Sequence, residues 1–521
     1  MKMERRELAK KIFYVVGGSL AGASVLKSQA NELKYQSEAQ HVDIASLYRS
    51  NNSLHDTVNI LQFGTMNDAS SAFYQALLYI NKRGGGNLLV PNGNYIFNRA
   101  VKIRIGCKIS IYTSSNTIMT MSENEDMFNI IGSEHAAFRI FGNGEFIYSG
   151  PKTESASCIR FISLNNGGVY ASSSFECNGR LRFRKGKNEW KYALHLTDVR
   201  DVVLIGPQFD GLNLPGKMSE QIGVYVQTKN SASVSWVISD LQFNDMNTAF
   251  YIESNTVPGA EGFKFFNCDM VGVKCGIFFK NNAKYYPPQI EIVGCHMNGY
   301  GSLINVDKVL SIHIVGGLFY RKGGSDGAFL EFDSVQDVSI VGASFCLTGK
   351  ETDVPCILIK STDGISGFFR ISDCHFWANK RKKPFLKILG EINTLLLSNS
   401  SKDSSGKWID TSEMSSFRDN IHVDTNTISL SEIDKGEIWG GSIDCAMGIV
   451  DLRNALPGIV YLKNATALKK IFGGRINSIY VLISDSVLEL QYGVNITNGS
   501  EVGKGKKKIS VIFDGENYTI I

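Results

Sequence analysis

The sequence predicts an all-β protein whose centre is a parallel β-helix, a solenoid with three strands in each turn, preceded by a short helical cap. Three observations predict this fold. A five-residue signature recurs through residues 199–398, two further short strands separate successive signatures, and the 521 residues include 51 Gly and 30 Phe but only 10 Pro. A repeat of about 20–50 residues indicates a solenoid, because each repeat buries its apolar face only by stacking on its neighbours.

The signature closes on a phenylalanine or a methionine, and successive closing residues lie 34, 27, 27, 22, 26 and 31 positions apart. Its seven copies close on Phe209, Phe243, Met270, Met297, Phe319, Phe345 and Phe376. We expect these residues in the packed wall of the solenoid. A loop and a second strand follow each copy, as in residues 249–253, and then a third strand, as in residues 289–293. The coil itself makes equivalent strands parallel neighbours.

The loop before the second strand varies most in length, from about four residues at 298–301 to about fourteen at 209–223. Loops gathered at one corner of a rigid scaffold often carry binding residues. We therefore expect the strand that follows this loop to form the working face of the molecule.

Residues 58–97 predict the cap. Apolar residues recur at helical spacing after Asn67 and Asp68, which suit a helix start, and the glycine run 84–86 suits its end. These apolar residues are Ala72, Phe73, Ala76, Leu77 and Ile80. Strands at 87–90 and 95–97 follow, separated by a Pro-Asn-Gly-Asn turn. A helix here would cover the open first turn of the solenoid and its unpaired backbone groups.

Charge and cysteine content argue against several functions. The net charge is +4 and the basic residues are scattered, so the sequence shows no basic patch that would indicate nucleic-acid binding. The ten cysteines have no C-x-x-C spacing, so we expect no metal site, no cofactor and no disulfide framework. Cys268, Cys295 and Cys374 share one position of the signature, which predicts a structural stack of buried thiols in reducing surroundings.

The first thirty residues are typical of a targeting peptide. Arg5 and Arg6 precede a modestly apolar run at 13–26 and small residues up to Ala30, a pattern similar to a twin-arginine export signal. The run is too short and too rich in small residues for a stable membrane span. The alternative interpretation is an uncleaved peptide that docks onto another protein.

The sequence of the cap is similar to that of a known protein family. The run VNILQFGTMNDASSAFYQALLYINKRGGGNLLVPNGNYIF resembles the N-terminal cap of pectate-lyase-like right-handed β-helix proteins, above all phage tailspikes and capsule depolymerases. The shared features are a Phe-Gly pair, the helix with Ala76 near its middle, the glycine run and the Pro-x-Gly-x-Tyr turn. The chain has residues 67–71, Asn-Asp-Ala-Ser-Ser, where the family usually carries Asp-Gly-x-x-Asp-Asp. The resemblance covers residues 58–400 and implies a right-handed parallel β-helix.

The C-terminal run ISVIFDGENYTII is similar to the last hairpin of many phage tailspikes. This likeness implies a C-terminal β-sandwich-like domain that makes the chain a homotrimer. A polar stretch at 400–406 suggests the boundary before it. The predicted division is therefore 1–57, a leader or virion-anchoring segment with its linker; 58–126, the cap and first strands; 127–400, the β-helix; and 401–521, a C-terminal domain for trimerisation or carbohydrate binding.

The candidate site is argued from position, because the chain has neither a P-loop nor an H-E-x-x-H motif. Side chains alternate along a strand, so Phe250 and Ile252 are expected inside and Tyr251 and Glu253 outside. The same phase on neighbouring turns predicts an outward stripe of Tyr225, Gln227, Tyr251, Glu253, Phe278, Lys280, Asn305, Asp307, Phe329, Glu331 and Asp333.

Aromatic rings interleaved with carboxylates suit a glycan, since rings stack on sugars and carboxylates act as acid and base. The alternative for any single member is an ordinary solvated position. Adjacent turns lie about 4.8 Å apart, and glycosidase carboxyl pairs lie at about 5–5.5 Å for retention or about 6.5–9.5 Å for inversion. The predicted catalytic residues are Glu253, Asp307, Glu331 and Asp333. The predicted substrate-binding residues are Tyr225, Gln227, Tyr251, Phe278, Lys280, Asn305 and Phe329.

Other candidates stay open. Asp210 and Asp245 follow the closing residue of the signature at the loop corner. A lyase would need a base and a charge neutraliser, for which Tyr251, Lys280 and His296 form the nearest set. His296 and His375 occupy one signature position and are more typical of a structural stack. The basic run 380–383 suits an acidic sugar or a solvated loop.

The resemblance and the stripe together predict a homotrimeric phage or prophage tailspike, located in the virion tail, that binds and depolymerises a bacterial surface polysaccharide. Hydrolysis is favoured over β-elimination, and the N-terminal segment would join another tail protein. A non-catalytic receptor-binding spike is one alternative. A bacterial polysaccharide lyase or hydrolase, exported through the twin-arginine-like signal, is the other.

Overall fold

A computed structural model describes most of the chain from residue 57 onward. The described ranges are 57–164, 171–212, 219–257, 259–287, 289–322, 327–348, 354–364, 366–378, 384–402, 408–413, 421–423, 442–445, 449–452, 458–465, 467–472, 478–484, 489–490, 496–497, 508–513 and 517–520. The predicted leader and the basic run 380–383 lie outside these residues. No helix within the described ranges has the length and apolar character that crossing a membrane would need.

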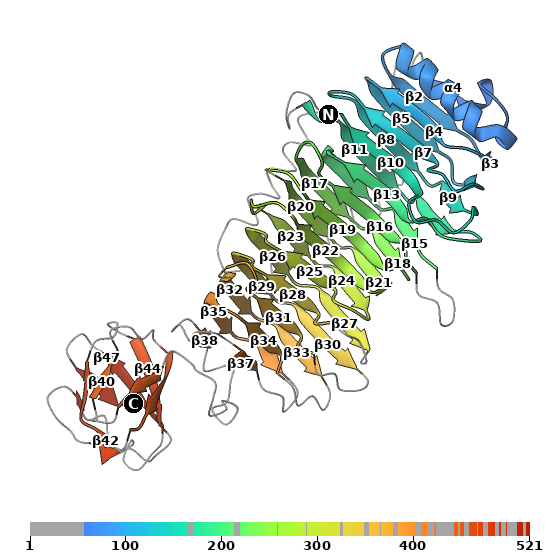
Figure 1. The fold of residues 1–521 in the computed structure, drawn as a ribbon. Coiled ribbons are helices and arrows are strands. Elements are labelled where there is room, and N and C mark those ends of the chain that lie inside the picture. Colours follow the sequence, from blue (N-terminus) through green and yellow to red (C-terminus); the bar gives the residue numbers. More distant parts are fainter. Residues whose placement is uncertain are drawn as a thin grey trace, which may run out of the picture. The chain divides into compact units, whose positions relative to one another are not determined.

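Three parallel sheets form a solenoid, and each turn adds one strand to each sheet in the order A, B, C (Figure 1). Sheet A contains β1 (Thr57–Asn59), β2 (Gly86–Val90), β5 (Lys108–Thr113), β8 (Ala137–Gly142), β11 (Ser174–Gly179), β14 (Arg200–Ile205), β17 (Ser233–Ser239), β20 (Ala260–Phe266), β23 (Ile290–Val293), β26 (Ser311–Val315), β29 (Asp337–Val341), β32 (Ser366–Ser372), β35 (Ile392–Ser398) and β38 (Ile421–Val423).

Sheets B and C each contain twelve strands. Sheet B contains β3 (Gly93–Phe97), β6 (Thr117–Met121), β9 (Glu145–Tyr148), β12 (Arg182–Lys185), β15 (Gln208–Asp210), β18 (Gln242–Asn244), β21 (Asp269–Val273), β24 (His296–Gly299), β27 (Leu318–Lys322), β30 (Ser344–Thr348), β33 (His375–Ala378) and β36 (Ser401–Lys402). Sheet C contains β4 (Val101–Ile105), β7 (Phe128–Gly132), β10 (Ser157–Ser163), β13 (Tyr192–Thr197), β16 (Ile222–Gln227), β19 (Thr248–Ser254), β22 (Cys275–Asn281), β25 (Ile304–Asp307), β28 (Leu330–Asp333), β31 (Ile357–Lys360), β34 (Leu386–Leu389) and β37 (Ile409–Glu413).

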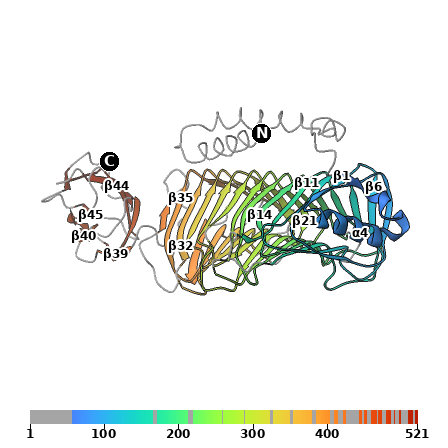
Figure 2. The same ribbon diagram turned by 90° about the horizontal axis from the view of Figure 1, so that it is seen from above.

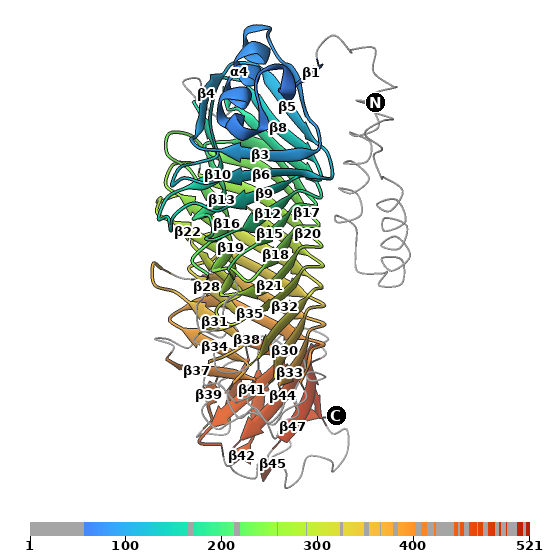
Figure 3. The same cartoon turned by 90° about the vertical axis from the view of Figure 1, so that its right-hand side faces the viewer.

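The predicted three-faced parallel coil is confirmed, and its strands stack turn upon turn from β3 through β21 along sheet B (Figure 3). The coil also continues beyond residue 400, where the signature is no longer readable, because β36, β37 and β38 extend the same three sheets. The extent of the coil is therefore defined by the pairing of its strands and not by the recurrence of the five-residue signature.

The closing residues of the signature line the interior of sheet B, as predicted. Phe209 and Phe243 stack face to face with ring centroids 4.7 Å apart, and Phe183, one turn before the first signature, continues this stack at 4.9 Å. Phe319, Phe345 and Phe376 form a second stack at 5.1 and 4.8 Å. Met270 and Met297 pair in register between the two stacks. All of the closing residues are buried, so this column is core rather than site.

The second position of the signature makes the turn from sheet A to sheet B. From β8 to β36 this connection is always two residues long. Its first residue has a left-handed backbone at Gly206, Asp240, Asn267, Gly294, Gly316, Gly342, Asp373 and Asn399, with φ between 46° and 85°. Glycine, asparagine and aspartate tolerate this conformation best, which explains their recurrence there. The third position buries Cys268, Cys295 and Cys374, and the predicted burial of these thiols is confirmed.

The N-terminal cap is confirmed. Helix α4 (Ala69–Lys82) follows the short 3-10 helices η2 (Ile60–Gln62) and η3 (Met66–Asp68). The Asp68 carboxylate accepts the backbone N–H of Ser71 at 3.2 Å, which satisfies a free donor at the helix start. Phe73 packs its ring against Tyr95, Phe97 and Phe128 at 6.2, 5.2 and 5.3 Å. The helix thus closes the apolar interior of the first turn.

The C-terminal region has a separate apolar core that includes Tyr480 and Tyr518. Its curled six-stranded sheet has the order β39 (Ser442–Asp444), β41 (Gly458–Lys463), β44 (Ser478–Ser484), β47 (Lys508–Phe513), β48 (Tyr518–Ile520) and β46 (Ile496–Thr497). Two small sheets pair β40 (Ile449–Asp451) with β43 (Lys470–Phe472) and β42 (Ala467–Leu468) with β45 (Glu489–Leu490). The predicted last hairpin is confirmed, since β47 and β48 pair antiparallel. Trimerisation through this domain stays a prediction.

Candidate functional site

The outer face of sheet C carries two rows of side chains that run along the solenoid. Parallel register places His195, Tyr225, Tyr251, Phe278, Asn305 and Glu331 in the first row. The second row contains Gln227, Glu253, Lys280, Asp307 and Asp333. The predicted alternation is confirmed on β19, where Phe250 and Ile252 are buried and Tyr251 and Glu253 are partly exposed. Most members of the predicted stripe therefore lie on one face.

Four aromatic rings form a ladder on this face. Tyr192 stacks on Tyr225 with a centroid distance of 4.8 Å, Tyr225 meets Tyr251 at 5.3 Å, and Tyr251 meets Phe278 at 5.0 Å. The ladder covers Tyr225 so well that only 8% of it is exposed, which corrects its predicted place on the open surface. Tyr192, Tyr251 and Phe278, by contrast, remain partly exposed.

Glu253 is fixed beside the ladder by three side-chain donors. The Tyr225 hydroxyl donates to Glu253 Oε2, and Gln227 Nε2 reaches the same oxygen at 3.3 Å. Asn282 Nδ2 donates to Glu253 Oε1 at 3.3 Å. Burial raises the pKa of Tyr225, and its hydrogen bond to the Glu253 carboxylate raises that pKa further. The arrangement keeps Tyr225 protonated and orients Glu253 as an acceptor for a ligand hydroxyl.

Asp307 and Asp333 are direct neighbours at the end of the second row, one residue on each of β25 and β28. Burial raises the pKa of Asp307, Lys308 opposes this, and the charge of Asp333 adds to the rise. Asp333 Oδ1 accepts the backbone N–H of Thr362 at 3.0 Å and its hydroxyl at 2.8 Å. The two carboxyl groups thus differ in environment: burial raises the pKa of Asp307, and hydrogen bonds hold Asp333 in place.

Tyr286 also belongs to this cluster, although it was not among the predicted site residues. Burial raises its pKa, and the charges of Asp363, Asp307 and Asp333 raise it further while Lys308 lowers it. Asp363 itself forms an ion pair with Lys308. Tyr286 lies in the loop after β22, and Asp363 lies in the loop after β31. Only the folded coil therefore brings them beside Asp307 and Asp333.

Phe329 is placed differently from expectation, whereas Glu331 lies where it was expected but is engaged by other side chains. Phe329 is fully buried rather than outward, with the Arg321 guanidinium 4.5 Å from its ring centroid. The reason is that β28 begins at Leu330, so the alternation of that strand does not extend back to residue 329. Glu331 does face outward, but it accepts from the Ser302 hydroxyl and pairs with Lys360 at 3.0 Å. Its contacts are those of a structural brace.

The remaining candidates lie on another face. His296 begins β24 in sheet B and pairs with Asp269 at 3.6 Å, whereas Tyr251 and Lys280 belong to sheet C. The structure therefore does not assemble the lyase set of Tyr251, Lys280 and His296. Asp210 also lies in sheet B, where Arg182 contacts it at 3.2 Å. Asp245 follows β18 with a left-handed backbone, at the loop corner where it was expected.

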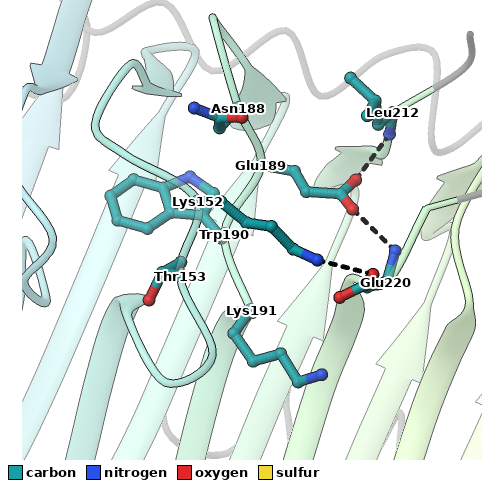
Figure 4. Close-up of a pocket in the computed structure, with 8 residues that line it drawn as sticks. All are labelled: Lys152, Thr153, Asn188, Glu189, Trp190, Lys191, Leu212 and Glu220. Atoms are coloured by element: carbon teal, nitrogen blue, oxygen red, sulfur yellow. Dashed lines mark hydrogen bonds and ion pairs between the residues drawn. The ribbon is translucent and has the colours of Figure 1, made fainter.

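A small pocket opens at the corner between sheets B and C, just before Tyr192 (Figure 4). Its lining residues are Lys152, Thr153, Asn188, Glu189, Trp190, Lys191, Leu212 and Glu220. Glu189 accepts the backbone N–H groups of Leu212 and Glu220 at 2.8 and 2.7 Å and the Ser219 hydroxyl at 2.7 Å. Lys152 bridges to Glu220 at 2.8 Å. Glu189 thus anchors both ends of the longest loop of this corner beside the aromatic ladder.

His195 lies beneath the ladder and was not predicted. Its ring is 4.8 Å from Tyr225 and 5.1 Å from Tyr192, and 5% of the residue is exposed. Neither ring nitrogen has a hydrogen-bond partner. Burial, with the nearby cations Arg160 and Lys229, lowers the pKa of His195 to about 3. This imidazole is neutral under the face. Over the described part of the chain, no group of three or more His, Cys, Asp or Glu could hold a metal ion.

No protein-family model matches the sequence, and no curated protein matches it. Solved structures do resemble the fold at low identity. The A-module of a mannuronan C-5 epimerase from Azotobacter vinelandii is 12% identical, with a TM-score of 0.47 over 70% of this chain and 97% of that one. The tailspike protein of the E. coli bacteriophage HK620, in complex with a pentasaccharide, is 11% identical, with a TM-score of 0.42 over 72% and 81%. PfbA, a surface adhesin of Streptococcus pneumoniae, is 10% identical, with a TM-score of 0.37 over 89% and 98%.

Proposed function

We propose that the outer face of sheet C binds a bacterial surface polysaccharide and hydrolyses it, with Asp307 as general acid and Asp333 as nucleophile. The observation that carries the proposal is the pairing of these two carboxyl groups on adjacent strands at the end of an aromatic ladder. Rings that stack on sugars hold the chain of the polysaccharide along the face. The aspartate pair then acts on the linkage that lies over β25 and β28.

The raised pKa of Asp307 suits the acid role. A protonated Asp307 gives its proton to the glycosidic oxygen as the bond to the anomeric carbon breaks, and Asp333 attacks that carbon to form a glycosyl ester. Water then adds to the anomeric carbon, and Asp307 removes its proton, so both carboxyl groups return to their starting states. Adjacent strands lie about 4.8 Å apart, close to the roughly 5–5.5 Å of retaining enzymes. We therefore propose retention of configuration.

Glu253 and Lys280 bind rather than react in this scheme. Glu253 is already oriented by Tyr225, Gln227 and Asn282, and Lys280 is the exposed cation between Glu253 and Asp307 in the second row. Gln227, Asn305 and Phe278 complete the binding surface. Glu331 supports this surface through its contacts with Ser302 and Lys360, and Phe329 supports it from within as a buried ring.

The biological setting that fits these residues is a phage or prophage tailspike. The cap sequence and the C-terminal hairpin, which resemble those of tailspikes, support this assignment. We propose a homotrimer that acts at the host surface from the virion tail, with residues 1–57 joining it to another tail protein. N-terminal sequencing tests the alternative of an exported enzyme: an intact Met1 supports virion assembly, and a mature chain that starts at Asn31 supports export.

The activity is tested with a panel of purified capsular polysaccharides and lipopolysaccharides. On a cleaved polysaccharide we expect new reducing ends without the ultraviolet absorbance of an unsaturated sugar. Asp307→Asn and Asp333→Asn should each lower the rate by about 10²–10⁴-fold, while Asp210→Asn on sheet B should leave it unchanged. The rate should fall as the pH rises through the pKa of Asp307, because the acid must carry its proton. An unsaturated product would contradict hydrolysis.

Non-catalytic binding is the second candidate, and the hydrogen bonds of Asp333 favour it. Thr362 donates twice to this carboxylate, as it would to a purely structural aspartate. A receptor-binding spike would hold the polysaccharide on the ladder without shortening it. Wild-type protein that binds one polysaccharide of the panel stably, and weakly after Tyr251→Ala, but releases no reducing ends would select this function.

A further inference from the structure

The small pocket at the corner between sheets B and C is built by three successive loops, and we call it the corner pocket. Lys152 comes from the loop between β9 and β10, Trp190 from the loop between β12 and β13, and Leu212 from the loop between β15 and β16. Because its lining comes from three turns, the stacking of the coil shapes the pocket, and no single loop does.

Trp190 brings an unused hydrogen-bond donor to the corner pocket. The residue is fully buried, and its ring packs on Tyr148 with a centroid distance of 4.6 Å. Within the described residues its indole Nε1 has no hydrogen-bond partner. A buried N–H group that has lost water without gaining an acceptor is costly, so an acceptor from a ligand is favourable here. Trp236 and Trp408 also bury an unpartnered Nε1, but neither residue lines this pocket.

The Lys152 side chain is a movable cover over this donor. Figure 4 shows it crossing in front of the indole ring on its way to Glu220. Its ammonium pairs with the Glu220 carboxylate at 2.8 Å, and 58% of the side chain is exposed. An exposed ion pair of this kind contributes little to stability. A ligand can therefore displace the flexible Lys152 stem and reach the indole N–H.

The charges of the lining balance, which argues against an ionic ligand. Two lysines, Lys152 and Lys191, stand against two glutamates, Glu189 and Glu220. Both oxygens of Glu189 already accept donors from the next loop, at 2.7–2.8 Å. An anion would meet the two carboxylates, and a cation would meet the two ammonium groups. The corner pocket therefore suits a neutral group with an acceptor atom.

An apolar wall adjoins the unused donor. Trp190 and Leu212, which is 7% exposed, are the apolar members of the lining. The methylene groups of the lysine stems extend this wall. A neutral group with a carbonyl oxygen beside a methyl group matches the combination, because the oxygen accepts the N–H and the methyl group packs on the wall. The acetamido group of an N-acetyl amino sugar has this structure, and its amide oxygen is a stronger acceptor than an ester oxygen.

The corner pocket lies at the start of the aromatic ladder and far from the aspartate pair. Its lining residue Lys191 directly precedes Tyr192, the first ring of the ladder. Asp307 on β25 and Asp333 on β28 follow β13 by four and five strands in sheet C, which is about 19 and about 24 Å at ~4.8 Å per strand. In Figure 2 the sheet A strands of the pocket's turns, β11 and β14, lie nearer to α4 than β32 and β35 do. Several sugar residues are needed to span this distance.

We propose that the corner pocket is a subsite for the acetamido group of an N-acetyl amino sugar, with Trp190 Nε1 as donor to its carbonyl oxygen and Leu212 against its methyl group. The inference rests on the proposed function in one respect, since it takes this sugar to be part of the polysaccharide that the ladder holds. The pocket then fixes which linkage of the repeating unit lies over Asp307 and Asp333. Binding in the pocket and hydrolysis at the pair are separate events, and each can fail alone.

The test is saturation-transfer NMR on the full chain, with N-acetyl-D-glucosamine and N-acetyl-D-galactosamine as probes. We expect saturation to reach the acetyl methyl protons of at least one probe. Trp190→Phe keeps a ring but removes the N–H, and it should weaken the binding by about 5–10-fold, the loss of one hydrogen bond. Trp236→Phe removes a similarly buried, unpartnered N–H outside the pocket and should leave the signal unchanged. No transfer with wild type, or equal transfer with Trp190→Phe, would overturn the subsite.

A second measurement uses the unchanged chain and so does not depend on how a variant folds. An analogue of N-acetyl-D-glucosamine with a diazirine in its acyl group is photolysed with the protein, and mass spectrometry locates the adducts. We expect adducts on Trp190 or Leu212 that excess N-acetyl-D-glucosamine suppresses. Adducts only elsewhere would overturn the subsite, and equal suppression by 6-O-acetyl-D-glucose would overturn its assignment to an amide.

The two proposals fail in different ways. Wild-type protein that gives these adducts but releases no reducing ends from any polysaccharide of the panel would refute only the proposed hydrolysis. Protein that releases reducing ends without giving the adducts would refute this inference alone.

Discussion

The two corners that flank sheet B differ: one is uniform along the coil, and the other varies from turn to turn. The corner from sheet A into sheet B is two residues long at every turn from β8 onward and begins with a left-handed residue at every turn from β14 onward. The corner from sheet B into sheet C ranges from the single residue Lys274 to the loop 211–221. Backbone conformation fixes the first corner, so its residues recur. Side-chain anchors such as Glu189 hold the second, so each of its turns is different.

The same contrast applies to the aromatic stacks beyond each corner. Phe345 stacks inside sheet B on Phe319 and Phe376 at 5.1 and 4.8 Å and is buried. Tyr251 stacks at 5.3 and 5.0 Å in the ladder outside sheet C. Similar ring distances thus serve packing in one stack and an open surface in the other.

The largest expected loss of stability comes from removing one ring of the phenylalanine stack inside sheet B. Phe345→Ala removes a buried ring from a packed wall and should lower the free energy of unfolding by about 3–5 kcal/mol. Tyr251→Ala, the matched change on the outer ladder, should cost only about 0.5–1.5 kcal/mol, because its ring is partly solvated. Urea denaturation of the two variants measures the difference. Equal losses would mean that the ladder is as much a part of the core as the signature column.

A smaller effect is expected from the uniform corner itself. Gly316 has φ 65°, which a β-branched residue adopts only with strain, so Gly316→Val should destabilise the protein by about 1–2 kcal/mol. Gly316→Asn should cost much less, since asparagine occupies the equivalent position at Asn267 and Asn399. Lys274→Val at the other corner is the control and should change stability by less than about 0.5 kcal/mol. If Gly316→Val melts at the wild-type temperature, the left-handed turn does not explain the signature.

The sequence was sufficient wherever the backbone repeats. The left-handed residue and the buried closing residue recur at each signature, and the cap helix carries its own start and stop, so the coil and its inner wall could be predicted. The alternation within β19 followed from local period alone. It failed at Phe329, because strand phase is lost one residue before β28 begins.

The sequence could predict which face of the coil carries the candidate site, but not how its residues contact one another. Alternation places Asp307 and Asp333 outside, and register then makes them neighbours. Tyr225 is covered because Tyr192 and Tyr251 close over it, a contact among three turns that one strand does not encode. His296 resembled a lyase base in the sequence, but the turn into sheet B puts it on another face. Nothing in the sequence pointed to Glu189 either, since its partners are backbone groups of a loop in the next turn.

The residue that tests the covered part of the ladder most directly is His195. Its folded pKa of about 3 lies below the ordinary value of 6.5, because burial disfavours the charged ring and Arg160 and Lys229 repel it. As the pH falls below about 6.5, the unfolded chain takes up a proton that the folded chain refuses until about pH 3. Wild-type stability should therefore decline over this window, by about 2 kcal/mol from this residue at pH 5.

His195→Phe removes both the titration and the two buried nitrogens without partners, while keeping a ring between Tyr192 and Tyr225. At pH 7 the variant should be more stable by on the order of 1 kcal/mol, since a buried unpaired polar group is costly. Its advantage should widen as the pH falls to 5, measured by urea denaturation at each pH. His296→Phe, whose side chain is 39% exposed, is the control and should follow the wild-type curve. A constant difference between His195→Phe and wild type would mean that the imidazole takes up its proton at the same pH in the folded and unfolded chains, and that the ladder leaves it open to water.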